Sequence, residues 1–466
     1  MMEKPQPLDA KVAKRIRPFL RLGRYFSEDF IQLTERLLFL VREHGVAQVQ
    51  PVPTNKEEWL RFAMRVHDGW KEAQVIIAAK VLENLASADG LARSVAEHHK
   101  ARNRVEKKTA IVELRRLRME IRILRRTLDV APWTIFKGEQ STIRLLSVRG
   151  GETNLSAKNI NDALPAAQWL NEDPSKVAIC ADITSFIHIC DILLVDLNSK
   201  GGVSFVELKS GAKNLAISRA AALARHPESG DFESQFKAML TSKDLQHFER
   251  VKKQQKRADT VVSTINDEGG TDHNTGATVE IVPSKLAVEL FSTEIVSCYE
   301  QLSEDKHWAI ASIDNCLHLG VYNDQKSAFI GFNAWMDVEH CTSRIFNITD
   351  SFRMPWVRPF GSLDLPLELL QKVFRGEVSI VLCLDVKAFV ELANSMFPNY
   401  LSVASKSETA AACDEFYEYL QLDGRVINCN SARGWIVGRG VLDRIVFDLQ
   451  RPSNLLEMQH AALDAG

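Results

Sequence analysis

The sequence predicts an α/β multidomain protein with a helical N-terminal region, a central α/β core built on a mixed sheet, and a C-terminal α/β domain. Three observations support this: helical periodicity over residues 8–128, strand-like runs from about residue 131 onward, and a segment at 266–278 that is rich in turn-forming residues. With 45% hydrophobic and 25% charged residues, the chain has an ordinary globular composition. We expect domains at 1–130, 131–265 and 279–466, with 266–278 as a linker.

The N-terminal region ends in a basic amphipathic helix expected at 100–128. Its apolar residues alternate in steps of four and three, like a short heptad seam, which could pair with a second copy of the chain or pack within it. The other faces carry eleven Lys or Arg between residues 100 and 126, and these would bind phosphate if that surface is open; a solvated outer face is the alternative. The seam consists of Ala110, Leu114, Leu117, Ile121, Leu124 and Leu128. The candidate nucleic-acid-binding residues are Arg115, Arg118, Arg122, Arg125 and Arg126.

The rest of the chain alternates strand-like and helix-like segments, the pattern of α/β domains. In the central core we expect a strand at 142–148, a helix at 159–170, two strands within 187–209, and a polar helix ending near residue 258. In the C-terminal domain we expect strands at 308–313, 329–335, 378–384 and 444–449, and helices at 366–374 and 408–420.

The segment at 187–209 is the most informative part of the sequence. Two strand-length runs of β-branched and large apolar residues flank a turn-forming NSKGG stretch, so we expect a hairpin. Side chains alternate along a strand, which puts Glu207 and Lys209 on one face. A turn centred on Ser199 places Asp191 opposite Glu207, and a turn centred on the next residue places it opposite Lys209. In either register the three side chains meet.

Two carboxylates and an ammonium at the end of apolar strands are costly to desolvate unless they bind something. Mg2+ is the natural ligand, because it prefers oxygen donors and keeps several waters, and Mn2+ could replace it. We expect Asp191 and Glu207 to hold the ion, and Lys209 to orient or activate the attacking water. Asp182 and Asp196 are further candidate ligands, although Asp196 fits a turn cap better.

An aspartate followed by a hairpin and a Glu-x-Lys strand resembles the PD-(D/E)XK nuclease superfamily, also called the restriction-endonuclease-like fold. The resemblance covers about residues 140–260. It implies a phosphodiester-cleaving core in which Asp191 and Glu207 are metal ligands, the Leu208 carbonyl faces the metal, and Lys209 is the catalytic lysine.

The chain departs from the family pattern in one place and leaves two family features open. Cys190 stands where the family has a proline before the aspartate. The resemblance implies a glutamine on a helix after the lysine, for which Gln246 is the first candidate and Gln235 the second. An acidic residue on the preceding helix would correspond to Glu172 or Glu152, neither at a persuasive spacing.

These observations predict a metal-dependent endonuclease acting on DNA, and by analogy with flanked nuclease cores a role in bacterial restriction or anti-phage defence. A catalytically inactive nuclease-like fold that binds nucleic acid or supports assembly is one alternative, and a metal-free hydrolase with paired carboxylates is another. The net charge of -2 means that nucleic acid would have to bind at a local basic patch.

The eight cysteines form no CxxC pair, which argues against structural zinc and for buried thiols in a reducing cytoplasm. The start of the chain lacks the apolar core of a secretory signal, and the longest apolar run, at 185–197, is too short for a membrane helix. We therefore expect a cytoplasmic protein with no membrane partner; the sequence leaves open whether it forms a homo-oligomer or acts with a partner protein.

Overall fold

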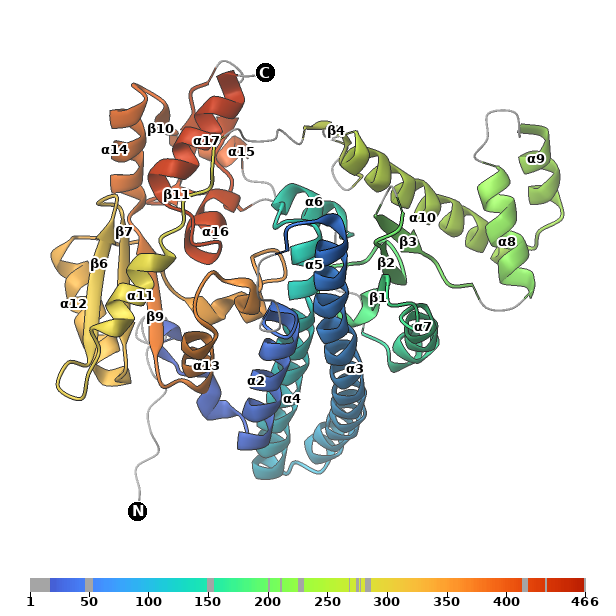
Figure 1. The fold of residues 1–466 in the computed structure, drawn as a ribbon, viewed down its shortest axis with the longest axis horizontal. Coiled ribbons are helices and arrows are strands. Elements are labelled where there is room, and N and C mark those ends of the chain that lie inside the picture. Colours follow the sequence, from blue (N-terminus) through green and yellow to red (C-terminus); the bar gives the residue numbers. More distant parts are fainter. Residues whose placement is uncertain are drawn as a thin grey trace. The chain divides into compact units, whose positions relative to one another are not determined.

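The computed structural model divides into two compact units (Figure 1). Phe39–Val282 form the unit that we call the central unit, and Met1–Leu38 together with Pro283–Gly466 form the terminal unit. Helix α2 (Glu28–Arg42) runs through the boundary between them. The structure describes residues 17–46, 53–148, 155–199, 202–209, 212–224, 230–267, 269–273, 276, 278–280, 286–412, 418–431 and 434–464.

The division differs from the predicted domains at both ends of the chain. The helices after residue 38 belong with the predicted nuclease core rather than to a separate N-terminal module. The first 38 residues belong with the C-terminal part, where the Arg375 guanidinium donates to Glu28 at 2.9 Å and to both Glu35 oxygens at 2.5 and 2.6 Å. Periodicity in the sequence predicts where helices form but not which core each helix packs in, so the sequence could not show that the first 38 residues join the C-terminal part.

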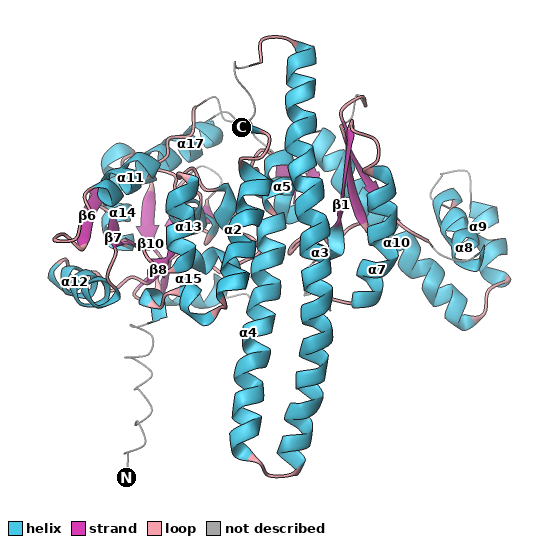
Figure 2. Ribbon diagram, turned by 60° about the horizontal axis from the view of Figure 1, so that its bottom comes forward, coloured by secondary structure: helices cyan, strands magenta, loops and turns pink. Residues whose placement is uncertain are grey.

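Two long helices, α3 (Lys56–Lys100) and α4 (Arg104–Leu128), run side by side as an antiparallel hairpin in the central unit (Figure 2). Every residue of the predicted α4 seam is buried, and Leu114 and Leu117 pack against Ala88 of α3. The seam is thus used within the chain. The other helices of this unit are α5 (Val130–Ile135), α6 (Gln140–Leu145), α7 (Ala157–Leu170), α8 (Ala212–Leu223), α9 (Gly230–Ala238) and α10 (Ser242–Asn266).

A three-stranded antiparallel sheet lies between α7 and α8 in sequence, with strand order β1-β2-β3. Strands β2 (Ile192–Asp196) and β3 (Val203–Val206) form the predicted hairpin, and β1 (Lys176–Cys180), which was not predicted, pairs with the other edge of β2. The sheet is therefore antiparallel rather than mixed. The strand predicted at 142–148 is wrong, because α6 occupies most of that segment.

The predicted linker at 266–278 is also wrong in part. Strands β4 (Gly269–Thr271) and β5 (Thr278–Glu280) pair with each other, and His273 Nε2 lies 2.8 Å from the Leu145 carbonyl oxygen. Glycine and threonine in this segment form a small hairpin that docks on the central unit. The change of unit comes a few residues later, after Val282.

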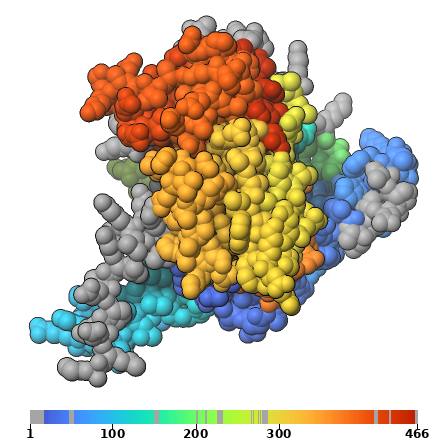
Figure 3. Space-filling view, turned by 90° about the vertical axis from the view of Figure 1, so that its left-hand side faces the viewer, coloured from blue at the N-terminus to red at the C-terminus, as the bar shows by residue number. Residues whose placement is uncertain are grey.

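The terminal unit is built on a four-stranded antiparallel sheet of order β6-β7-β9-β8. Helix α12 (Gln325–Val338) covers one face of it, where Phe332 and Met336 pack on Tyr322 and Val381. The segments from α11 to α12, yellow to gold, form one continuous face of this unit, with the orange segments after β9 above them (Figure 3). The strands are β6 (Trp308–Ile313), β7 (Leu317–Tyr322), β8 (Ile345–Asn347) and β9 (Ser379–Leu384).

A second small sheet joins β10 (Leu401–Val403), β12 (Arg425–Cys429) and β11 (Gln421–Leu422), with β13 (Trp435–Ile436) beside β12. The predicted strands at 329–335 and 444–449 are wrong, because α12 and α16 cover most of these segments; both are apolar runs that also fit a helix face. The remaining helices are α11 (Ser292–Glu300), α13 (Leu367–Arg375), α14 (Val386–Met396), α15 (Lys406–Ala412), α16 (Gly440–Phe447) and α17 (Pro452–Asp464).

The fold is thus an α/β multidomain arrangement rich in helix, as the sequence predicts in outline. None of the helices in the described part of the chain combines the length and the apolar character that crossing a bilayer requires.

Candidate metal centre

Asp191 and Glu207 flank the same end of the β2–β3 pair. The register pairs Ile192 with Val206, so its continuation by one residue sets Asp191 beside Glu207, as expected for a turn centred on Ser199. The Asp191 N–H donates to the Val206 carbonyl at 3.1 Å. The paired strands end at Ile192 and Val206, and this bond does not continue their ladder to Glu207, so the two carboxylates lie just beyond the regular part of the hairpin.

The Asp191 carboxylate is fixed by a second backbone group. The Leu208 N–H donates to Asp191 Oδ2 at 2.6 Å, a short bond of the kind formed by charged acceptors. The predicted contribution of Leu208 was its carbonyl; the contact that the structure shows is made by its amide instead. This bond closes the loop after β3 onto the start of β2.

Glu207 is the most constrained side chain of the centre. Its Oε2 accepts from Lys209 Nζ at 3.0 Å, its Oε1 accepts from Gln254 Nε2 at 2.7 Å, and 18% of its side chain is exposed. Burial and the neighbouring Asp191 raise the pKa of Glu207, while Lys209 and Gln254 oppose that rise. The carboxylate therefore carries an electrostatic cost that a cation would relieve.

Asp182 adds a third carboxylate. It lies on the 3-10 turn η4 (Ala181–Ile183) directly after β1, and the Ala181 N–H donates to the Asp191 carbonyl at 2.9 Å. Burial and Asp191 raise the pKa of Asp182, and Arg125 and Asn159 lower it. The unpredicted strand β1 brings Asp182, a further candidate ligand in the sequence, to the same end of the sheet.

The glutamine at the centre is Gln254, not the predicted Gln246. Both lie on α10, but Gln246 is exposed, and so is the second candidate, Gln235, on α9. Eight residues, or a little over two helical turns, separate Gln246 from Gln254, so the error concerns how far along α10 the contact falls. Glu172 is exposed, and Glu152 lies outside the described residues.

The arginines proposed to bind nucleic acid divide into two groups. Arg115, Arg118 and Arg122 are exposed on α4. Arg125 is half-buried and donates to the Thr184 carbonyl at 2.9 Å. Arg126 is a correction: only 2% of its side chain is exposed, and it donates to Asp129 Oδ2 at 2.9 Å. A buried, paired guanidinium cannot reach phosphate.

Two neighbours of Asp191 take no part in acid–base chemistry at neutral pH. Burial and Arg125 lower the pKa of His188 to about 4, which keeps the imidazole neutral. Burial and the carboxylates of Glu207 and Asp191 raise the pKa of Cys190 well above its usual value, so its thiol stays protonated.

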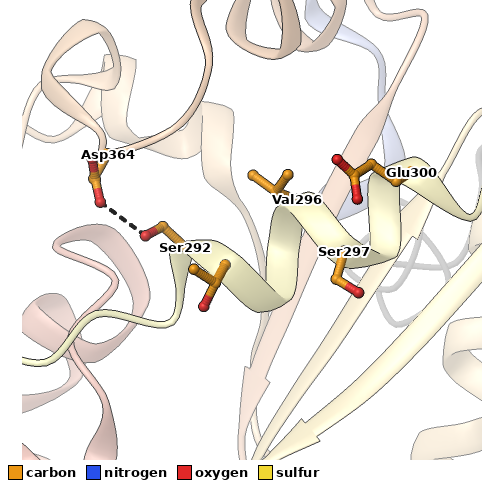
Figure 4. A pocket seen from close by; sticks show the side chains of 6 residues that line it. Ser292, Val296, Ser297, Glu300 and Asp364 are labelled. Carbon is orange, nitrogen blue, oxygen red and sulfur yellow. Dashed lines mark hydrogen bonds between the residues drawn. The ribbon is translucent and has the colours of Figure 1, made fainter.

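A pocket in the terminal unit offers less chemistry. It lies along α11 and is lined by Ser292, Thr293, Val296, Ser297, Glu300 and Asp364 (Figure 4). The Ser292 hydroxyl donates to Asp364 Oδ2 at 2.9 Å across its rim. One hydroxyl–carboxylate bond at the start of a helix needs no ligand to explain it.

Comparison of the chain with models of known families, with curated proteins and with solved structures finds no match.

Proposed function

We propose that this chain is a metal-dependent nuclease that hydrolyses phosphodiester bonds, with Asp191, Glu207 and Lys209 at its centre. The observation that carries the proposal is the convergence of two strand-end carboxylates and a lysine at one end of the β2–β3 pair, with burial raising the pKa of Glu207. An exposed hairpin with a surface Glu–Lys pair would explain the ion pair alone. It would not explain why a second carboxylate, Asp191, lies near Glu207, whose ionised form is already disfavoured by burial.

Carboxylate oxygens suit a hard divalent cation; the ligand oxygens of Asp182, Asp191 and Glu207 do not all lie within 4.8 Å of one another, so a bound ion would have to draw them together. Asp182, Asp191 and Glu207 supply carboxylate oxygens, and the Asp191 charge disfavours ionisation of the other two. Asp191 and Glu207 would hold Mg2+, with Asp182 as a further oxygen donor. When bound, the ion would stabilise the negative charge that develops on the phosphoryl oxygens and favour the deprotonated form of a nearby water.

The protein's own groups then have separate roles. Lys209 lies against Glu207, where its ammonium can orient the attacking water and stabilise charge on the phosphate. Gln254 holds the second oxygen of Glu207 from α10, so it acts as a positioning residue. The resemblance to the PD-(D/E)XK superfamily implies a glutamine on a helix after the lysine, and α10, which follows α8 and α9, supplies one.

DNA is the substrate that we propose, with α4 as the surface that binds its backbone. Arg115, Arg118 and Arg122 are exposed in the unit that contains the centre. Because the whole chain has a net charge of -2, attraction to a polyanion depends on such a local cluster.

Incubating the purified protein with plasmid DNA and with RNA in Mg2+, Mn2+ or chelator tests the proposal. Glu207→Ala and Lys209→Ala should abolish cleavage, while Lys213→Ala, which alters an exposed lysine paired with Asp244 at 2.7 Å, should leave it unchanged. Cleavage that persists in chelator would support a metal-free hydrolase instead. No cleavage under any condition, with DNA binding unaffected by Glu207→Ala, would favour the inactive binding module.

A further inference from the structure

A second cluster of potential metal ligands lies in the terminal unit, at one end of its main sheet. His318 of β7 and Cys383 of β9 are direct cross-strand partners, so their side chains share a face. Asp385 follows Cys383 by two residues, and its N–H donates to the Cys316 carbonyl at 2.8 Å, which extends the strand alignment to that point. The sheet therefore brings a histidine, a cysteine and an aspartate to the same end of its two inner strands.

The fourth residue, Cys341, does not belong to the sheet and reaches this face from just beyond the helix that packs on it. It follows α12, the helix that covers this face, and it packs against the apolar cluster that contains Cys383. Ligand atoms of His318, Cys341 and Asp385 all lie within 4.8 Å of one another, and Cys383 Sγ lies 3.6 Å from Cys341 Sγ. Three donors thus converge, and Cys383 lies beside one of them, Cys341.

The burial of His318 leaves a ring nitrogen that could bind a ligand here. Only 5% of the residue is exposed, and its Nδ1 has no hydrogen-bond partner among the described residues. The Trp335 ring packs edge-on against the imidazole, with 4.9 Å between centroids, so water has little access from that side. A buried polar atom left unpaired costs free energy that coordination would recover.

We propose that His318, Cys341 and Asp385 bind a zinc ion, with Cys383 supplying the fourth ligand. Mixed nitrogen, sulfur and oxygen donors suit zinc and not magnesium. Two thiolates on one tetrahedral zinc, with Zn–S bonds of about 2.3 Å, lie about 3.7 Å apart. The 3.6 Å between the two sulfur atoms fits that geometry, and shifts of about 1 Å would bring the ligand atoms of His318, Cys341 and Asp385 to coordination distance of one ion. Cys383 lies outside that group of three, so its side chain would have to move further to complete the site.

Asp385 can serve this site without giving up its structural role. Its Oδ1 caps α14 by accepting from the N–H groups of Lys387 and Ala388 at 2.9 and 3.1 Å. The cap uses one carboxylate oxygen, so the other is the donor for zinc. The bound ion would join the end of α12 to the β9–α14 junction, which gives it a structural role in the terminal unit, separate from the centre at Asp191.

Zinc titration of the full-length protein tests this proposal. The protein is purified in reductant, stripped with chelator, and titrated with Zn2+ against a chromophoric competitor; Co2+ is then used as a spectroscopic substitute. We expect one Zn2+ per chain and a thiolate-to-cobalt charge-transfer band. Glu207→Ala should retain both signals, because the two centres lie in different units.

Two variants and one control identify the ligands. Cys341→Ser alters a half-exposed side chain, and Asp385→Asn keeps an acceptor for the α14 cap, so both should fold. Each should weaken zinc binding by more than about 100-fold, beyond the effect of losing an outer-shell partner. Cys429→Ser, at a buried cysteine of β12 outside the cluster, should bind zinc like the unaltered protein.

Absence of zinc binding, or unchanged affinity in both cluster variants, would overturn the proposal. A third contrary outcome is a Cys341–Cys383 disulfide in protein purified without reductant, if that protein binds no zinc after the disulfide has been reduced.

Discussion

Replacing Glu207 by glutamine should stabilise the protein in chelator while removing its nuclease activity. The amide keeps the shape of the side chain and an acceptor for Gln254, and it loses the charge. Asp191 disfavours the charge of Glu207, and two like charges about 5 Å apart would repel by about 3 kcal/mol at an effective dielectric constant of about 20. The ion pair between Glu207 and Lys209 offsets about 1 kcal/mol of this repulsion, and the partial exposure of Glu207 reduces the repulsion further. We expect a net gain of about 1 kcal/mol.

The gain should depend on pH in a defined direction. Folding raises the pKa of Glu207 above the ordinary value of 4.5. Below the ordinary value the carboxyl is protonated in both states, so variant and unaltered protein should be equally stable at that site. As pH rises through the folded-state pKa, the ionised form becomes a cost in the folded protein only, and the variant should become the more stable of the two.

Urea denaturation in chelator, followed by circular dichroism at several pH values, measures this difference. Glu233→Gln is the matched control: Glu233 lies in the same unit, has 19% of its side chain exposed, and pairs with Lys237 and Lys252 at 2.7 and 2.6 Å. Those partners lower the pKa of Glu233, so its replacement should destabilise the protein at neutral pH. Loss of stability in both variants would refute the idea that Glu207 sits in a strained cluster of carboxylates. Cleavage of DNA should fall by at least about 100-fold in Glu207→Gln alone.

Three further predictions concern the central unit. Gln254→Ala should lower DNA cleavage by about 10–100-fold because Glu207 loses its positioning bond, whereas Gln246→Ala should not change it; equal effects in an initial-rate assay would be inconsistent with the observed contact. Burial lowers the pKa of His67 to about 4, so protonation of the unfolded chain below pH 6.5 should cost about 3 kcal/mol of stability by pH 4. Denaturation midpoints at pH 7 and pH 4 should therefore differ less in His67→Gln. Arg126→Ala should destabilise the protein by about 3–5 kcal/mol, because it leaves the buried Asp129 carboxylate without its cation, and a change below 1 kcal/mol by the same denaturation assay would count against that reasoning.

The candidate centre shows where local patterns suffice and where they fail. The hairpin and its shared face follow from two-residue alternation, and both turn positions that the sequence allows bring Asp191, Glu207 and Lys209 together, so these residues could be grouped from sequence. Gln254 could not be chosen over Gln246, because the angle and offset at which α10 meets the sheet are set by packing. Asp182 depended on β1, whose five residues carry too short a pattern to be recognised.

Local patterns account for the features governed by neighbours a few residues apart: the helical character of α3 and α4, the buried seam, and the carboxylates and lysine at the end of β2 and β3. Which segments share a core and which charges are buried depends on how these elements pack. Packing placed the first 38 residues with the C-terminal part, enclosed Arg126 beside Asp129, and gathered His318, Cys341 and Asp385 from positions far apart in the chain. The physical reason is that periodicity records what a residue does within its own helix or strand, whereas burial and coordination depend on surfaces that meet only when the chain has folded.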